Sequence, residues 1–310
     1  MRLILILFFC ISALLSIQTC NADTSRTIFY VVTNTNRTAV SFFNSLKQTV
    51  KATNTTFKLA TLDSVEFTQQ GNVLYIAVGN RSFRYLIEKN ISAPILAIFI
   101  SRLSFQRILD TRGKKLKNSK ISAVFSDPAP IHQLYLTKYL FPNAPKSTVI
   151  ISNRTEFLQQ ELKDASTKTG VPLDIILHTK NHKIGKTLHE IGATGVILAL
   201  PDSSIYNSDT IPRIILSAYR HNQSIVGFSR QFVEAGALAT VYTDTGHIQN
   251  EVVDILEKYI ARGILPSPTY PRLFDVEINE RVSDSYNLIL PSESSLKKNI
   301  KYSLEVCCEK

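Results

Sequence analysis

The sequence predicts an α/β protein built on two parallel sheets. Strand-like and helix-like segments alternate regularly along the chain, which is typical of parallel sheets covered by helices on both faces. The chain has 310 residues, which exceeds one compact lobe and suits two. A single sheet with this many strand-like runs would be unusually wide. We therefore expect two smaller sheets, each in its own lobe.

The expected strands are short runs of apolar, β-branched and aromatic residues. The runs VLYIAV (73–78) and PILAIFI (94–100) are apolar throughout, as in strands that are covered on both faces. In chain order the predicted strands are 27–33, 57–62, 73–78, 94–100, 121–125, 148–151, 173–177, 196–200, 224–227, 239–242 and 273–278.

The segments between these strands carry apolar residues at helical spacing. The predicted helices are 39–52, 83–88, 103–110, 131–140, 155–166, 184–191, 211–220, 247–261 and 280–287. Asp127 and Pro128 precede the helix at 131–140 in an arrangement typical of a helix start. We therefore expect Asp127 to act as the N-cap of that helix.

The first 22 residues are predicted to be a secretory signal peptide. Arg2 precedes an apolar run at 3–17, and a polar patch that ends in Cys20, Asn21 and Ala22 follows. The run is shorter than the ~20 apolar residues that span a bilayer. The residues at 17–19 lack the small side chains that precede a lipidated cysteine, so we favour cleavage after Ala22 over a lipid anchor at Cys20. The mature protein is expected to be exported from the cytoplasm.

The basic charge and the remaining cysteines indicate no special chemistry. The formal net charge is +10, but the lysine runs at 114–120 and 297–301 lack the interleaved aromatic residues of a nucleic-acid module. We therefore predict no nucleic-acid partner. Cys307 and Cys308 are adjacent near the C-terminus, where they cannot staple a core.

No catalytic, phosphate-binding or metal-binding motif is complete. The patterns GxxxxGK[ST], GxSxG and GxGxxG after a strand do not occur. His178 and His182 have i,i+4 spacing but no HExxH motif or supporting carboxylate, so we interpret them as a surface pair. The sequence thus predicts no enzyme, no cofactor and no bound metal.

The most informative polar segment is the loop at 201–209, PDSSIYNSD, which follows a buried strand. In open α/β sheets ligands bind at the carboxyl ends of the strands. Asp209 lies next to a predicted helix start, so Asp202 is the better candidate for a ligand contact.

Three stretches carry a family resemblance. They are SDPAPIHQLYLTKYLFPNAPKSTVIIS (126–152), LPDSSIYNSDTIPRIILSAYRHNQSIVGFSRQFVEAGALATVYTD (200–244) and ILEKYIARGILPSPTYPRLFDVEINERVSDSYNLILP (255–291). They resemble substrate-binding proteins of bacterial ABC transporters with the type I periplasmic-binding fold, in the subgroup with tryptophan- and tyrosine-binding proteins. The resemblance covers roughly the whole mature chain and is strongest after Ile121.

The resemblance implies two Rossmann-like lobes joined by hinge crossings. The first lobe would comprise residues 23–121 and about 233–265. The second would comprise 122–232, with about 266–290 as part of it or as a closing element at the hinge. Residues 291–310 would be a C-terminal tail.

The resemblance also implies a ligand site between the lobes, which would capture a solute by hinge closure without bond chemistry. An aromatic side chain could stack on the solute. The implied site residues are Asn34, Asn36, Gly79, Asn80, Ser82 and Ser101 on the first lobe, Asp127, Asp202, Tyr206, Asn207 and Ser229 on the second, and Gly236 near the return crossing.

The implied function is capture of a small polar solute, such as an amino acid, for a membrane permease by a monomeric protein. Residues 100–104 (ISRLS) depart from the family pattern, which alters one wall of the site. Three alternatives stay open: a sensing module for an envelope signalling partner, an envelope enzyme, and a chain that kept the fold and lost its ligand.

Overall fold

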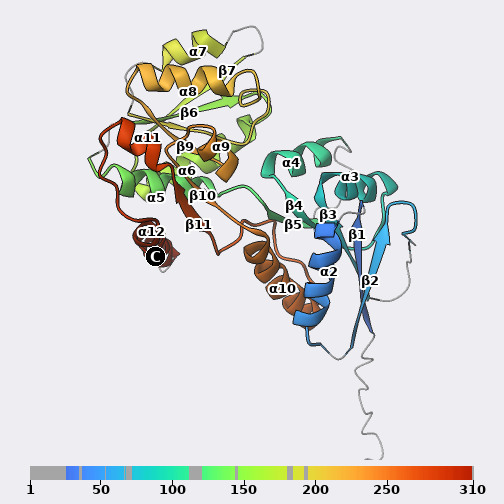
Figure 1. The fold of residues 1–310 in the computed structure, drawn as a ribbon. Coiled ribbons are helices and arrows are strands. Elements are labelled where there is room, and N and C mark those ends of the chain that lie inside the picture. The colour runs from blue at the N-terminus through green and yellow to red at the C-terminus, as the bar shows by residue number, and fades with distance from the viewer. Residues whose placement is uncertain are drawn as a thin grey trace, which may run out of the picture.

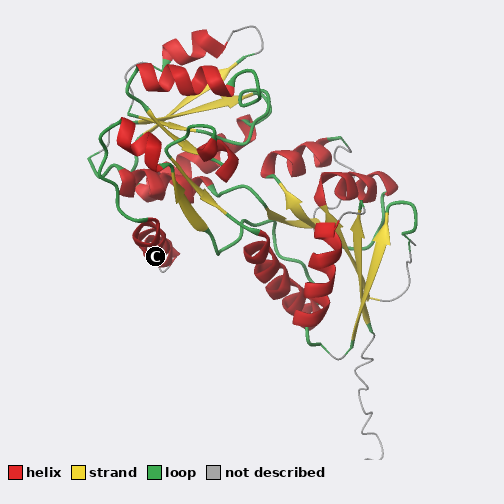
Figure 2. Cartoon of the chain, viewed as in Figure 1, coloured by secondary structure: helices red, strands yellow, loops and turns green. Residues whose placement is uncertain are grey.

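The computed structural model describes residues 26–34, 37–52, 54–65, 67, 72–111, 121–143, 146–179, 184–191 and 195–308. The predicted signal peptide and the candidate site residue Asn36 lie outside these ranges. Within them the chain forms two α/β lobes, and Figures 1 and 2 show helices on both faces of each sheet. The predicted α/β class with two sheets is confirmed.

The first lobe is a parallel sheet of five strands in the order β2-β1-β3-β4-β5. The strands are β1 (Thr27–Thr33), β2 (Thr55–Thr61), β3 (Asn72–Val78), β4 (Ile95–Ile100) and β5 (Ile121–Phe125). One face packs against α2 (Arg37–Thr49) and α10 (Thr245–Arg262), and the other against α3 (Gly79–Lys89) and α4 (Arg102–Asp110). Apolar side chains alternate between these two cores, because successive strand residues face opposite sides of a sheet.

The second lobe is a sheet of six strands in the order β11-β10-β9-β8-β6-β7, with β11 antiparallel to β10. The strands are β6 (Ser147–Ser152), β7 (Leu173–His178), β8 (Val196–Leu198), β9 (Ser224–Gly227), β10 (Ala239–Tyr242) and β11 (Asp275–Ile278). One face packs against α5 (Pro130–Leu140), α6 (Gln159–Thr169) and α12 (Glu293–Cys308). The other packs against α7 (Ile184–Glu190), α8 (Ile211–Arg220) and α9 (Arg230–Glu234). The short helix α11 (Glu280–Ser285) follows β11.

The chain passes between the two sheets after β5, between β10 and α10, and between α10 and β11 (Figure 1). Hydrogen bonds hold these crossings to β5 and to one another. Thr269, in the third crossing, donates its N–H to Ala123 and accepts the N–H of Phe125, both at 2.9 Å. Thr243, in the second crossing, donates its hydroxyl to the carbonyl of Ser126 at 3.2 Å. The junction between the lobes is therefore a hydrogen-bonded strip of three segments.

Two predicted boundaries differ from the structure. Residues 233–265 were expected in the first lobe, but β10 pairs with β9 and β11 in the second sheet, and the return to the first lobe occurs only at α10. Residues 291–310 were expected as a tail, but α12 packs on the second lobe with Leu296 and Ile300 fully buried. The lysines around these two apolar residues obscured the helical stripe in the sequence.

Two helix starts also differ from expectation. Helix α3 begins at Gly79, where φ is +80°, so 79–82 is a helical turn rather than the expected loop. Helix α5 begins at Pro130 with Ala129 as its N-cap and no side-chain cap. Asp127 does not cap α5. Its carboxylate instead reaches helix α4 of the first lobe.

Candidate functional site

The candidate residues on the first lobe lie after β1, β3 and β4, but most of them bond locally. Asn34 is exposed, and the Asn80 amide donates to the Ser104 hydroxyl at 3.4 Å. Ser101 is the N-cap of α4 and accepts the N–H of Ser104 at 3.1 Å. Ser82 is fully buried, and its hydroxyl lacks a hydrogen-bond partner among the described residues.

Asp202 on the second lobe lies at the centre of a hydroxyl network. One carboxylate oxygen accepts the hydroxyls of Ser152 at 2.5 Å and Thr155 at 3.0 Å. The other accepts the hydroxyl of Ser204 at 2.6 Å and its N–H at 2.9 Å. Burial by itself would raise the pKa of Asp202, but these hydrogen bonds outweigh it and hold the pKa below its ordinary value. The carboxylate thereby ties the loop after β8 to the end of β6.

We expect the Asp202→Ala substitution to lower the free energy of unfolding at pH 7 by about 3 kcal/mol, because hydrogen bonds to a charged group are lost and buried hydroxyls are left unpaired. Urea unfolding measures this loss. Asp209→Ala, at an exposed position of the same loop, is the matched control and should change stability by less than about 0.5 kcal/mol. Equal effects of the two substitutions would contradict a structural role for the network.

Tyr206 is buried rather than presented to solvent. Its ring makes edge contacts with Phe228 and Phe232, at centroid distances of 5.8 and 5.6 Å. Its hydroxyl lacks a hydrogen-bond partner among the described residues, and burial raises its pKa. An unpaired buried hydroxyl is unusual in a folded protein, so Tyr206 can offer a polar contact to a ligand that reaches it.

The other second-lobe candidates shape the backbone. The side-chain oxygen of Asn207 accepts the N–H of Asp209 at 3.0 Å, and Ser229 caps α9 by accepting the N–H of Phe232 at 3.2 Å. Gly236 has φ +126°, and a Cβ there would lie 3.0 Å from Ile215. These contacts set the loop and helix starts on the lobe.

Asp127 meets side chains from both lobes at their junction. Its carboxylate accepts the N–H of Arg102, at the start of α4, at 2.8 Å. The Arg102 guanidinium lies 5.4 Å from the ring centroid of Phe125 in the first lobe and 5.0 Å from that of Phe157 in the second. Phe157 belongs to a short 3-10 helix, η3 (Glu156–Leu158), after β6. Arg102 therefore bridges the two lobes through cation–π contacts.

Glu161 and Tyr270 complete this group. Glu161 lies on α6, and Tyr270 lies in the third crossing, where its hydroxyl donates to the Glu161 carboxylate. The Tyr270 ring packs edge-on against Phe125 at a centroid distance of 5.0 Å. We call Arg102, Asp127, Phe157, Glu161 and Tyr270 the interlobe cluster.

Burial dominates the electrostatics of the interlobe cluster. It raises the pKa of Asp127 from 3.8 to about 7, although the N–H of Arg102 favours the ionised form. Burial also raises the pKa of Glu161, which the Tyr270 hydroxyl and Arg102 partly offset. The cluster thus holds two carboxyl groups and one guanidinium at the junction of two lobes.

The sequence interpretation placed Asp127 in the site and missed the other four members of the cluster. Arg102 lies two positions after the end of β4, and that position was a signal of its own, because residues after parallel strands face ligands. Glu161 and Tyr270 lie in a helix and a proline-rich connector, where nothing in the local pattern distinguishes them.

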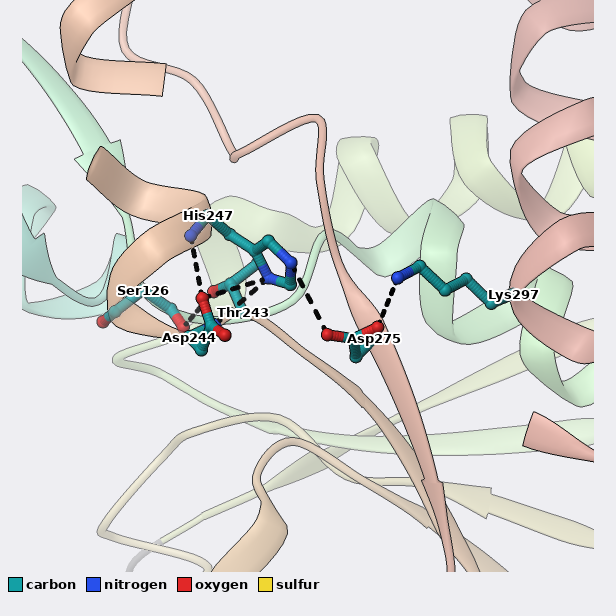
Figure 3. Close-up of polar contacts among 6 residues, drawn as sticks. All are labelled: Ser126, Thr243, Asp244, His247, Asp275 and Lys297. Atoms are coloured by element: carbon teal, nitrogen blue, oxygen red, sulfur yellow. Dashed lines mark hydrogen bonds and ion pairs between the residues drawn. The ribbon is translucent and has the colours of Figure 1, made fainter. Parts of the chain in front are cut away.

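A second charged group lies at the second crossing (Figure 3). Asp244 caps α10, because its carboxylate accepts the backbone N–H of His247 at 2.8 Å. Nε2 of the His247 ring lies 3.5 Å from a carboxylate oxygen of Asp275 in β11. The ligand atoms of these three residues lie within 4.8 Å of one another, as a metal site requires. However, the Lys297 ammonium donates to Asp275 at 2.5 Å, and a helix N-terminus carries partial positive charge. We assign the group a structural role in joining α10, β11 and α12.

Among the described residues, none of the helices is both long and apolar enough to cross a bilayer.

Comparisons with known proteins identify the fold. No family model and no curated protein matches the sequence. A ligand-free, open substrate-binding protein with adhesive properties from Clostridium difficile superposes with a TM-score of 0.60 and 14% identity, covering 86% of this chain and 96% of its own. An ABC domain in complex with L-Trp from Streptococcus pneumoniae gives 0.52 and 15%, covering 88% and 98%. A conserved domain protein from Vibrio cholerae gives 0.52 and 17%, with the same coverage.

The chain has the type I periplasmic-binding fold. In this fold Arg102 follows β4, Asp127 follows β5 and Phe157 follows β6. These are carboxyl ends of parallel strands from both sheets, the edge at which open α/β sheets bind ligands. The interlobe cluster therefore occupies the position expected of a binding site.

Proposed function

We propose that this protein binds a small polar solute between its two lobes and closes around it by motion at the crossings. The observation that carries the proposal is the bridge from Arg102 of the first lobe to Phe157 of the second, beside the buried carboxyl group of Asp127 and the half-buried one of Glu161. A buried carboxyl group is costly unless it is paired, and carboxyl groups with strongly shifted pKa values are candidates for a binding site.

The crossings support the proposed motion. Each lobe has its own core, and among the described residues the chain joins the lobes only at the three crossings, so they can rotate as bodies about the strip formed by Ser126, Thr243 and Thr269. Closure would bury a polar solute among the cluster side chains and bring it near Tyr206. We further propose that the monomeric protein works in the periplasm and delivers its solute to the membrane permease of an ABC transporter.

The test begins with the ligand. Native mass spectrometry of protein purified from its source should reveal a retained small molecule, and a panel of polar metabolites should raise the melting temperature with concentration. Small-angle scattering with the ligand should show a smaller radius of gyration, as hinge closure requires.

We expect Arg102→Ala to weaken binding of that ligand at least about tenfold, because the bridge between the lobes is lost. Arg107→Ala is the matched control, since Arg107 lies on the same helix and is exposed. Calorimetry measures both affinities. Unchanged affinity in Arg102→Ala, or binding without compaction, would contradict the proposed site.

A further inference from the structure

We infer that the solute carries a protonated amine, which the carboxyl groups of Asp127 and Glu161 hold at the junction of the lobes. This inference rests on the function proposed above and names its ligand class. The argument uses the charge count of the cluster, the contacts of Arg102 and the aromatic side chains around it.

The charge count comes first. The charge of Glu161 disfavours the ionised form of Asp127, and Asp164 in turn disfavours that of Glu161. The cation that acts on both Asp127 and Glu161 is Arg102. With both carboxyl groups ionised, this part of the cluster carries one negative charge in excess. Burial opposes that excess and raises the pKa of both acids. A cationic ligand group would neutralise it.

The contacts of Arg102 disfavour a ligand carboxylate as the primary contact. Its side chain donates to Gln106 at 3.3 Å, and its guanidinium lies over the rings of Phe125 and Phe157. It also offsets the charges of the two acids. The guanidinium is thus already engaged on several sides, and a second anion there would add to the existing excess of negative charge.

Aromatic faces complete a site for a cation. Phe157 is 37% exposed and lies against the Arg102 guanidinium, which also lies over Phe125. Phe125 in turn packs edge-on against Tyr270. Ring faces attract ammonium groups, most strongly where water is excluded. Carboxylates and ring faces together are the combination that recognises an amine.

Binding of a cation at the interlobe cluster is coupled to release of a proton from Asp127. The amine favours the ionised form of Asp127, so its binding expels the proton that Asp127 holds below about pH 7. The charged groups that face Asp127 are Arg102 on α4 and Glu161 on α6, and the Tyr270 hydroxyl lies on the crossing side. Amine affinity should rise about tenfold between pH 6 and pH 8, as the ionised fraction of Asp127 rises by that factor.

The experiment uses two sets of probes, and the members of each set share a side chain but carry an amine, a carboxylate or both. The aromatic set is 2-phenylethylamine, phenylalanine and 3-phenylpropionate, and the aliphatic set is butylamine, norvaline and pentanoate. The full mature chain is titrated with each by calorimetry at pH 6 and pH 8, in two buffers of different ionisation enthalpy. We expect the amine of at least one set to bind about tenfold more tightly than its amino acid, with proton release at pH 6.

Variants separate the possible outcomes. Asp127→Asn should abolish the pH dependence and the preference for the amine, whereas Asp110→Asn, an exposed acid at the far end of α4, should change neither. Tighter binding of an amino acid or acid, or a retained natural ligand without an amine, overturns this inference and leaves the proposed function standing. Failure of every probe to bind, with no retained ligand, contradicts the proposed function itself.

Discussion

Replacing Asp127 by Asn should make the protein less sensitive to pH. The folded-state pKa of Asp127 is raised to about 7 from 3.8, so the folded chain binds a proton there that the unfolded chain has released. Its contribution to stability is therefore fully present below pH 3.8 and is lost as pH rises through 7. Between pH 5 and pH 8 the parent protein should lose about 3 kcal/mol of unfolding free energy relative to Asp127→Asn.

Urea unfolding of both proteins across this pH range measures the effect, and the difference between the two curves cancels groups that titrate in both. The Asn side chain keeps an oxygen that can accept the Arg102 N–H, so the substitution chiefly removes the titration. Asp110→Asn should follow the parent curve. Parallel curves for Asp127→Asn and the parent would show that the Asp127 carboxyl is not desolvated at the junction.

Truncating the buried face of α12 should have the largest effect on stability. Leu296 and Ile300 are both fully buried against the second lobe, one turn apart on that helix. Each substitution to Ala removes apolar contacts and leaves a cavity, at about 2–5 kcal/mol per site. We expect the double variant Leu296→Ala/Ile300→Ala to lose about 5 kcal/mol of unfolding free energy, because neighbouring sites share part of one cavity.

Thermal and urea unfolding measure this loss. The control is Tyr302→Ala, whose side chain is 68% exposed on the same helix and should matter by less than about 0.5 kcal/mol. If the double variant were as stable as the parent, α12 would be an appendage, as the sequence suggested, rather than a part of the second lobe.

The two predictions illustrate which structural features local sequence patterns can predict and which they cannot. Strand periodicity identified the strands of both sheets, because each strand needs its own run of apolar and β-branched residues. Helix α12 escaped detection because it is held by a few apolar side chains, chiefly Leu296 and Ile300, that pack on the core of the second lobe. In the same way, Asp127 looked like a cap for the helix that follows it, whereas its partner lies 25 positions earlier in the sequence.

The candidate site likewise has features that the sequence predicted and features that only the structure showed. The sequence placed polar residues at the carboxyl ends of strands, and Ser101, Asp127 and Asp202 all lie there. It did not reveal that the carboxylate of Asp202 is occupied by hydroxyl groups, or that Asp127 is joined by Glu161 and Tyr270. Those partners come from other elements, and their contacts exist only when the chain crosses between lobes.

By itself, then, the sequence determined the α/β class, the two sheets and the edge at which a ligand should bind. The class and the sheets follow from hydrophobic periodicity, which is encoded in short stretches of sequence. The edge follows from the parallel direction of the strands, since parallel strands end at the same edge of a sheet. Only the tertiary structure decided which charged groups meet at that edge and how far they are desolvated. Burial and charge pairing depend on residues that are distant in sequence, so the meeting of two carboxyl groups with Arg102 became visible only once both lobes were in place.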